Sequence, residues 1–447
     1  MKVVILAGGG GTRLFPLSRS WLPKQFLEFD GKRSLLGLTL ERAMGIVRPS
    51  DLVVVTNPKH RDRVMLELES VGALGAHLVL EPVGRNTASA VALGASYLLN
   101  LGVPRGEVIL VAPSDHIMGP AGEFVGAVDK ACELALRGRW VVFGVRPAGP
   151  ETGYGYIEVG GPVGPGFLVR SFREKPDVES ARAYAEDPRY YWNSGMYCLT
   201  LGCLMDQLER HMEDLYRLVS RGYDEFISAF ADSPSVSIDR GLAEKSSDGA
   251  MVPFNGDWSD IGSWDAIYKW LQKDGDGNVI SGDCVALNCE GSLIMGQGRL
   301  IAALGLRDML VVDGGDAILV APRNESQRVG LLAEKLASLG GRELPELLAG
   351  CVNGVSCRSL IRGVGYDVTE VQVKPGGAID PHHHAKSSES WGVIEGKARV
   401  TIGNREMTVL AGDGVWVPVG ESCRIENVGD GPLRLVVVRI GHKVFGG

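Results

Sequence analysis

Four consecutive glycines and two cations near the start of the chain could hold a phosphorylated ligand. Gly8 to Gly11 follow the apolar run 3–6, Arg13 comes two residues after them, and Lys24 lies eleven residues beyond Arg13. Glycines let backbone N–H groups approach an anion closely, and Arg and Lys supply countercharge. The dinucleotide pattern G-x-G-x-x-G fails because Arg13 replaces its third glycine, and no Gly-Lys-Ser/Thr closes the run as in a P-loop. A tight strand-to-helix turn is the simpler alternative, but the cations favour phosphate binding.

A second group of residues that could do chemistry lies near the C-terminal end. His382 and His384 are one residue apart, so on a strand both would point the same way, and Glu389 returns on the next expected strand. Two imidazoles and a carboxylate are a ligand set for a divalent metal.

The elements that position the glycine loop belong to an α/β pattern. Apolar runs of the doubly buried kind occur at residues 3–6, 52–55, 108–111 and 141–143, and helical spacing occurs between them, as over 88–101. This alternation predicts a Rossmann-like, mixed or parallel sheet covered by helices on both faces. Ligands in such sheets bind at the carboxyl ends of the strands.

The pattern changes after about residue 270. Residues 275–325 hold short β-rich runs with turns every 8–10 residues, which predicts a β layer or short β-helix. Residues 326–348 have the pattern of a helical linker, and from about 352 the strand-and-turn pattern of a β-barrel or sandwich begins. We therefore expect three domains: an α/β domain over 1–270, a β-helix-like connector over 271–335 and a β-barrel over 350–447.

Seven segments in chain order carry a further pattern. They are LAGGGGTRLFPLSR with PKQF (6–26), EPVGRNTA (81–88), SDH (114–116), TGYGYI (152–157), EKPD (174–177), WNSGM (192–196) and WSDIGSW (258–264). Together they resemble the signature of the sugar-phosphate nucleotidylyltransferases, and within that family most closely the mannose-1-phosphate guanylyltransferases. The connector, with DGNV (276–279) and LGL (304–306), is also similar to the β-helical segment of that family.

The resemblance implies attack of a sugar-1-phosphate oxygen on the α-phosphorus of a nucleoside triphosphate, with GTP and mannose-1-phosphate as substrates. Because both are anionic, catalysis would be mostly positioning and charge neutralisation. By resemblance, Arg13 and Lys24 are catalytic. The nucleotide-binding residues would be Gly8, Gly9, Gly10, Gly11, Thr12, Glu81 and Asn86.

Asp115 and Asp260 are the residues that the resemblance pairs as ligands of Mg²⁺, a metal that prefers carboxylate and phosphate oxygens. Asp115 follows the strand 108–111, at its carboxyl end, so it is expected to face the cleft. Spacing alone cannot pair the two, and a helix N-cap is the alternative for Asp115.

Recognition of the base and of the sugar would fall to separate segments. The Glu81 carboxylate matches the N1–H and N2–H₂ donors of guanine, although a helical salt bridge to Arg85 is the alternative. On the sugar side, Gly153 and Gly155 would allow close backbone approach beside Tyr154 and Tyr156. Glu174 and Asn193 suit sugar hydroxyls, and Lys175 suits the phosphate of the sugar; the alternative for Glu174 and Lys175 is an exposed charged turn.

The histidine group resembles the paired motifs of the cupin barrel, as found in bifunctional guanylyltransferases that also isomerise mannose-6-phosphate. Two features depart from that pattern: Cys423 stands where the family has a histidine, and the Arg-Pro-Trp-Gly run that opens the isomerase domain is absent. Two interpretations remain open. One is a Zn²⁺ or other divalent metal on His382, His384 and Glu389; the other, which the departures favour, is a structural or dimerising barrel with a vestigial site.

Composition excludes several classes of function. A net charge of −8 without a basic tract argues against general nucleic-acid binding. No run approaches 18 apolar residues, no signal peptide is recognisable, and eight sparse cysteines lack zinc-knuckle spacing. We expect a cytoplasmic homodimeric transferase with reduced thiols. The alternatives are a bifunctional enzyme, a transferase for another nucleotide or sugar, and a regulatory subunit that binds sugar nucleotides.

Overall fold

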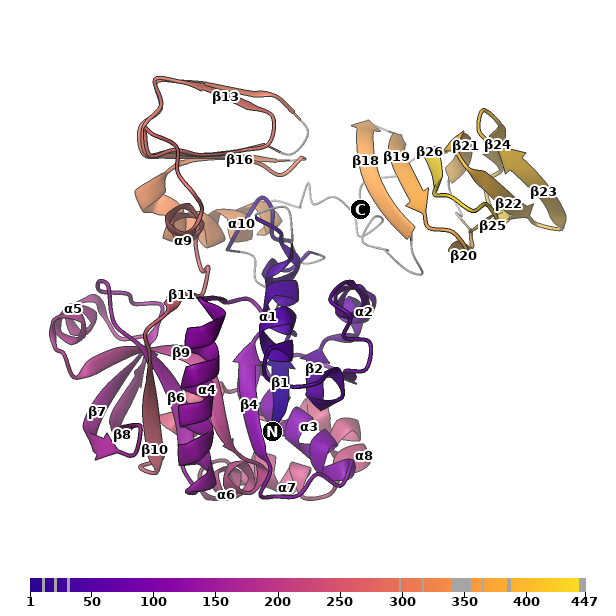
Figure 1. Ribbon diagram of the computed structural model, residues 1–447. Coiled ribbons are helices and arrows are strands. Elements are labelled where there is room, and N and C mark those ends of the chain that lie inside the picture. The colour runs from indigo at the N-terminus through magenta and orange to yellow at the C-terminus, as the bar shows by residue number, and fades with distance from the viewer. Residues whose placement is uncertain are drawn as a thin grey trace. The chain divides into compact units, whose positions relative to one another are not determined.

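A computed structural model describes residues 1–9, 13–19, 22–29, 33–296, 299–315, 317–338, 355–363, 365–383 and 387–441. The chain divides into two compact units, Met1–Gly341 and Arg342–Gly447. Figure 1 draws the second unit in orange to yellow.

The first unit is built on a nine-stranded sheet with the order β3-β2-β1-β4-β9-β6-β10-β8-β7. The strands are β1 (Lys2–Leu6), β2 (Leu52–Thr56), β3 (His77–Leu80), β4 (Val108–Pro113), β6 (Trp140–Val145), β7 (Gly155–Val163), β8 (Gly166–Glu174), β9 (Tyr190–Thr200) and β10 (Gly249–Phe254). The predicted parallel pairing is confirmed for β1 with β2 and β4. β9 runs antiparallel between β4 and β6, so the whole sheet is mixed.

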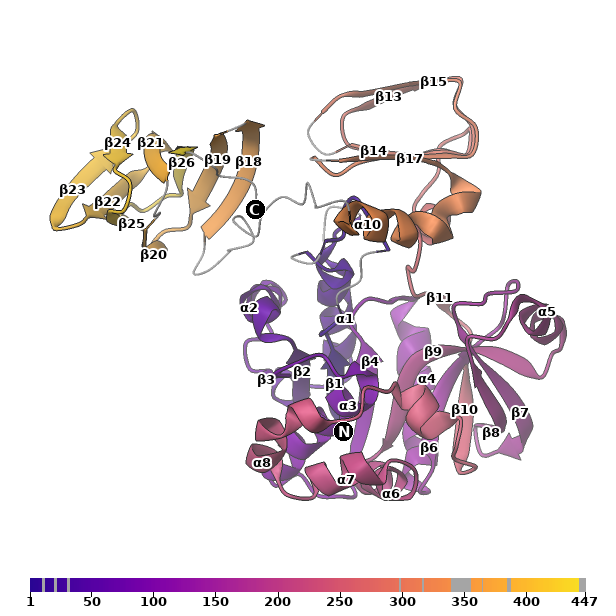
Figure 2. The ribbon, with the colours of Figure 1, turned by 180° about the vertical axis from the view of Figure 1, so that it is seen from behind.

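Helices cover both faces of this sheet, as predicted. They are α1 (Leu35–Met44), α2 (Arg61–Ser70), α3 (Asn86–Asn100), α4 (Ala121–Leu136), α5 (Val178–Glu186), α6 (Leu201–His211), α7 (Glu213–Val219) and α8 (Tyr223–Ser228). α1, α2 and α4 pack on one face, and α3, α6, α7 and α8 pack on the other. Figure 2 shows the second face, with α7 and α8 turned toward the viewer.

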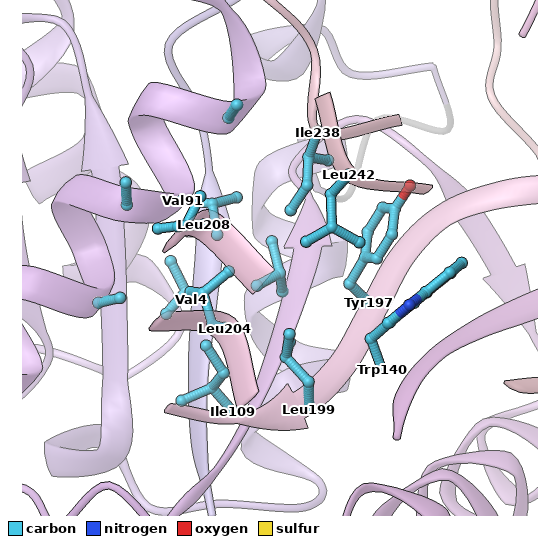
Figure 3. Packing of buried hydrophobic residues seen from close by; sticks show 14 of the residues in the cluster. Val4, Val91, Ile109, Trp140, Tyr197, Leu199, Leu204, Leu208, Ile238 and Leu242 are labelled. Carbon is cyan, nitrogen blue, oxygen red and sulfur yellow. The ribbon is translucent and has the colours of Figure 1, made fainter. Parts of the chain in front are cut away.

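The core under α3 shows how closely these layers pack. Val4 and Ile109 lie beside Leu204 and Leu208, all of them buried (Figure 3). α3 approaches β1 so closely that a Cβ atom on Gly94 would lie 2.8 Å from Val4 Cγ1. Burial of each such aliphatic side chain contributes about 1.5–3 kcal/mol, which holds the carboxyl ends of the strands in fixed positions.

The predicted β-helix follows α9 (Trp264–Trp270). β12 (Val279–Ser281), β14 (Leu293–Met295) and β16 (Met309–Asp313) pair in parallel, with β17 (Ile318–Pro322) antiparallel at the edge. β13 (Cys284–Leu287) and β15 (Ile301–Leu304) form a second parallel sheet, so the chain alternates between two sheets. A 3-10 helix (Arg323–Arg328) and α10 (Val329–Ser338) end this unit.

The β-helix packs on the segment that follows the glycine loop. Leu14 and Leu17 belong to the same buried cluster as Trp264 and Leu310. Trp264 Nε1 also donates a hydrogen bond to the Phe15 carbonyl oxygen at 2.8 Å. The connector therefore supports the loop that was predicted to bind phosphate.

The second unit contains two antiparallel sheets around one apolar core, in agreement with the predicted barrel. The larger sheet has the order β18-β19-β26-β21-β24, with β18 (Val355–Gly363), β19 (Tyr366–Val373), β26 (Leu433–Gly441), β21 (Ser387–Glu395) and β24 (Gly414–Val417). The smaller has the order β20-β25-β22-β23, with β20 (Ala378–His383), β25 (Ser422–Asn427), β22 (Lys397–Ile402) and β23 (Arg405–Leu410).

Among the residues that the structure describes, none of the helices combines the length and the hydropathy needed to cross a membrane. No disulfide joins the cysteines that the structure describes.

Candidate functional site

The glycine loop begins directly after β1, and its described part lies against Glu81. A Cβ atom on Gly8 would lie 1.8 Å from Glu81 Oε1, so any larger residue would displace this carboxylate. Gln25 Nε2 donates to the carbonyl oxygens of Ala7 (3.0 Å) and Gly9 (2.9 Å), which fixes the loop. The predicted nucleotide-binding residues Gly10, Gly11 and Thr12 lie outside the described residues.

Glu81 follows β3 and lines a cavity of about 420 Å³. Its side chain is 5% exposed, and burial raises its pKa. The alternative salt bridge is not formed, because the Arg85 guanidinium donates to the Ala231 carbonyl oxygen instead. Asn86, the first residue of α3, lines the same cavity, as do Gly8, Gly9 and Asp115. The structure thus brings five predicted site residues around one cavity.

Lys24, Asp115 and Asp260 meet at one point, although they come from distant segments. Lys24 opens a 3-10 helix (Lys24–Phe26), Asp115 follows β4, and Asp260 follows the short strand β11 (Asp257–Ser259). Lys24 Nζ lies 2.8 Å from Asp115 Oδ2 and also donates to the backbone carbonyl of Asp260. Burial alone would raise the pKa of Asp115, but Lys24 and His116 together bring that pKa below its usual value.

The carboxylate of Asp260 is held from two sides. Tyr154 donates its hydroxyl to Asp260 Oδ1 at 2.8 Å, and the Gly262 N–H donates to the same oxygen at 3.0 Å. Burial and the nearby Asp260 charge raise the pKa of Tyr154, so the phenol remains a donor. β11 pairs with β5 (Ile117–Gly119), the strand that follows β4 in the chain. This pairing places Asp260, at the end of β11, near the residues that follow β4.

A larger cavity of about 1330 Å³ opens beside this centre. Arg13, Gly153 and Asp260 line it, so it contains predicted residues for both the triphosphate and the sugar. Tyr154 forms part of the wall and packs edge-on against Trp192 and against Trp258, each at a centroid distance of 5.1 Å. The indole rings were not predicted as site residues.

The other predicted sugar-binding residues are already engaged within the protein. Glu174 and Lys175 form an ion pair at 3.1 Å, and burial raises the pKa of Glu174. Asn193 Nδ2 donates to Asp239 Oδ1 at 2.9 Å, while Asn193 Oδ1 accepts from the Gly195 N–H at 3.1 Å. Within the described part of the chain, Glu174, Lys175 and Asn193 line neither of the two cavities.

One tyrosine and one aspartate differ from what the sequence predicted for the site. Tyr156, which the sequence placed beside the sugar, is fully buried and accepts from the Glu151 N–H at 2.9 Å, so it belongs to the core. Asp239 was missed: it lines the smaller cavity and accepts hydrogen bonds from Asn193 and from the Tyr197 hydroxyl (2.6 Å). A single aspartate in a polar stretch gives no signal that could have identified it.

The candidate metal site of the barrel is described only in part. His382 lies on β20 opposite Cys423 of β25, but its side chain and the whole of His384 lie outside the described residues. Glu389 is engaged: Oε1 accepts from Arg439 Nε at 2.8 Å and Nη2 at 2.7 Å, and Oε2 accepts from Trp391 Nε1 at 2.8 Å. Arg439 therefore already supplies a positive charge to the predicted ligand.

Comparisons with protein families match almost the whole chain. A nucleotidyl transferase model matches residues 2–277, a mannose-phosphate isomerase/GMP-like β-helix model matches 282–336, and a model of the mannose-6-phosphate isomerase C-terminal region matches 355–445.

Individual relatives are similar over almost their full length. A xanthan biosynthesis protein of Xanthomonas campestris pv. campestris (strain B100) is 35% identical over 98% of this chain and 95% of its own. A mannose-1-phosphate guanylyltransferase of Salmonella montevideo is also 35% identical, with the same two coverages.

Among solved structures, one described as mannose-1-phosphate geranyltransferase from Thermus thermophilus matches with a TM-score of 0.69 and 32% identity. It covers 75% of this chain and 99% of its own. A mannose-6-phosphate isomerase from Helicobacter pylori matches with a TM-score of 0.50 and 28% identity, over 58% of this chain and 100% of its own. The chain belongs to the nucleotidyl transferase family, and within it to the mannose-1-phosphate guanylyltransferases.

Proposed function

We propose that this protein joins GTP and α-D-mannose 1-phosphate into GDP-mannose and releases diphosphate. The relatives of similar length include proteins named for this activity. The observation that carries the proposal is the meeting of Lys24 with Asp115 and Asp260 beside the glycine loop. A cation held by the Asp115 carboxylate and the Asp260 backbone carbonyl, at the carboxyl end of β4, suits a reaction between two phosphates.

In this proposal the chain positions the reactants and neutralises their charge. An oxygen of the sugar phosphate attacks the α-phosphorus of GTP, and the bond from that phosphorus to the bridging oxygen breaks as diphosphate leaves. The N–H groups of the glycine loop and Arg13, which lines the larger cavity, hold the triphosphate. The Lys24 ammonium, fixed close to the strand ends, stabilises the charge that develops at the α-phosphate.

A divalent cation fits the same centre. The donor set is two carboxylates, the ligands that Mg²⁺ prefers, and both belong to residues around the Lys24 ammonium, which contacts the carboxylate of Asp115 and the backbone carbonyl of Asp260. We assign Asp115 and Asp260 as the residues that would hold it. The bound ion would supply further neutralisation of phosphate charge. Tyr154 and Gly262 would keep the Asp260 carboxylate in place.

Recognition of the two substrates is assigned to the two sides of this centre. Glu81 would accept hydrogen bonds from guanine in the smaller cavity, and Asn86 would lie nearby. Gly153 would allow the sugar to approach the backbone. Lys175 and Glu174 would reach the sugar phosphate and the hydroxyls only by exchanging their mutual ion pair for the substrate.

Release of diphosphate from a matrix of nucleoside triphosphates and sugar-1-phosphates, with Mg²⁺ supplied, tests the function. We expect the combination of GTP and mannose-1-phosphate to react fastest. No release from that pair would overturn the proposal, and faster release from another pair would reassign the substrates within the family.

Alanine variants test the assigned centre. Lys24→Ala and Asp260→Ala should each lower turnover by roughly a hundredfold or more, because each removes a charge that acts at the reacting phosphate. Lys2→Ala is the matched control, since Lys2 also pairs with an aspartate, Asp51, but neither residue lines the two cavities. Turnover near that of the wild type would remove Lys24 or Asp260 from the mechanism.

Isomerisation of mannose-6-phosphate in the barrel has less support. Its ligand set includes Glu389, which is already paired with Arg439 and Trp391. A coupled assay for fructose-6-phosphate, with Zn²⁺ or Co²⁺ supplied, should give no turnover above background. Metal-dependent turnover would add the second activity to the protein.

A further inference from the structure

The Lys24 ammonium lies against Asp115, one of the two carboxylates proposed to hold a metal ion. It lies 2.8 Å from Asp115 Oδ2 and donates to the Asp260 backbone carbonyl. The Lys24 side chain is only 10% exposed, and that of Asp115 is 31% exposed. Lys24 is therefore held within the protein by these two acceptors rather than extended toward solvent.

Two cations cannot share this carboxylate without cost. An ammonium and a divalent ion within a few ångströms of the same oxygen repel each other, and low exposure reduces the screening by water. Asp260 has a carboxylate that is oriented independently of Lys24, since Tyr154 and the Gly262 N–H fix its Oδ1. Competition therefore concerns Asp115 and not the whole ligand set.

A phosphate can resolve this competition. The described end of the glycine loop is tied to the same 3-10 helix as Lys24, because Gln25, the next residue, donates to the carbonyl oxygens of Ala7 and Gly9. An anion bound at this loop would offer the ammonium a new acceptor within the same local structure.

We propose that Lys24 and a divalent cation compete for Asp115, so that a bound triphosphate, by drawing Lys24 away, raises the affinity of the centre for the cation. The proposal rests on the proposed function, because it takes Asp115 and Asp260 as the cation ligands. It adds that the lysine restrains metal binding until the nucleotide is present.

Titration of the full-length protein with Mn²⁺, without nucleotide, tests the competition. Free Mn²⁺ is counted by electron paramagnetic resonance. We expect Lys24→Met to bind Mn²⁺ about tenfold more tightly than the wild type, although the same variant should lose turnover. Lys24→Arg, which keeps the charge, and Lys2→Met, which removes a lysine from a distant pair with Asp51, should bind Mn²⁺ like the wild type. Equal or weaker binding by Lys24→Met would overturn the proposal.

A second measurement needs no variant. The rate at which an amine-reactive acylating reagent modifies Lys24 is followed by mass spectrometry, with Lys2 as the internal reference. Saturating Mn²⁺ should raise the relative rate at Lys24 at least threefold, because the displaced ammonium becomes accessible. An unchanged rate at saturation would refute the competition even if Lys24→Met does not fold.

These outcomes are separate from a failure of the proposed function. If the wild type makes GDP-mannose and Lys24→Met gains no affinity, only the competition is wrong. If Asp260→Asn binds Mn²⁺ as the wild type does, the assignment of the cation ligands is wrong, whatever the behaviour of Lys24.

Discussion

Replacing Glu81 by glutamine tests whether this carboxylate distinguishes guanine from other bases. The position of the Glu81 side chain is well defined, since it is 5% exposed and lines the smaller cavity. It also lies so close to Gly8 that a Cβ atom at residue 8 would collide with its carboxylate. Glutamine keeps the shape of the side chain. It replaces one acceptor oxygen by an N–H₂ donor, which would face a donor group of guanine.

The expected loss follows from the charge of the acceptor. A hydrogen bond to a charged group contributes about 1.5–3 kcal/mol, and about 1.4 kcal/mol corresponds to a factor of ten. Glu81→Gln should therefore lower kcat/KM for GTP by roughly ten- to a hundredfold. The loss for ITP, which lacks the N2 amino group, should be smaller, so the preference for GTP over ITP should fall.

Steady-state rates of diphosphate release with GTP and with ITP measure this preference. Glu67→Gln is the matched control, because burial also raises the pKa of Glu67 but that residue lines neither cavity. Acidification gives a further test: the raised pKa of Glu81 means that the charged form is lost at a higher pH than for an ordinary carboxyl group. KM for GTP should rise there in the wild type and not in Glu81→Gln. An unchanged preference for GTP over ITP would refute the role of Glu81.

Three further substitutions test separate contacts. Tyr154→Phe removes a 2.8 Å hydrogen bond to Asp260 and should lower kcat about tenfold and weaken Mn²⁺ binding; unchanged Mn²⁺ binding would contradict the positioning role. Asp239→Asn should raise KM for GTP about tenfold with little change in KM for mannose-1-phosphate, because Asp239 lines the cavity assigned to the nucleotide and its carboxylate accepts two buried donors there; the reverse pattern would assign it to the sugar. Glu389→Gln removes the closer of the two described acids beside Arg439, leaving Asp367 at 3.9 Å, and should destabilise the barrel by about 3 kcal/mol, measured by urea-dependent hydrogen exchange of β21; an unchanged free energy of unfolding would show that the pair is not stabilising.

The sequence was sufficient to predict the strands that are buried on both faces of the sheet. Runs such as 3–6 and 108–111 are continuous and apolar, and they became β1 and β4. β9 was not anticipated as a strand between β4 and β6, because its residues include the polar run around Asn193. Strand order depends on contacts between distant segments, which local patterns do not encode.

The candidate site divides in the same way. The motifs identified Lys24 and Asp115, but their 2.8 Å contact depends on how the 3-10 helix Lys24–Phe26 meets the carboxyl end of β4. The pairing of Glu389 with Arg439 depends on the register of β21 against β26, in which these two residues are direct partners. No spacing in the sequence gives that register. The sequence therefore predicted Glu389 as an available metal ligand, whereas in the structure its carboxylate is already paired with Arg439.

The packing of the β-helix on the glycine-loop segment limits how freely this enzyme can be recombined. Gly314 of the β-helix approaches Pro16 so closely that a Cβ atom on Gly314 would lie 2.7 Å from the Pro16 carbonyl oxygen. Trp264 of α9, the helix that precedes the β-helix, donates a hydrogen bond to the Phe15 carbonyl oxygen. A chimaera that exchanges the α/β part between relatives must therefore carry its own β-helix with it. The part of the chain that must be kept together for nucleotide binding therefore extends past residue 314, well beyond Asp260, the last site residue predicted for the transferase reaction.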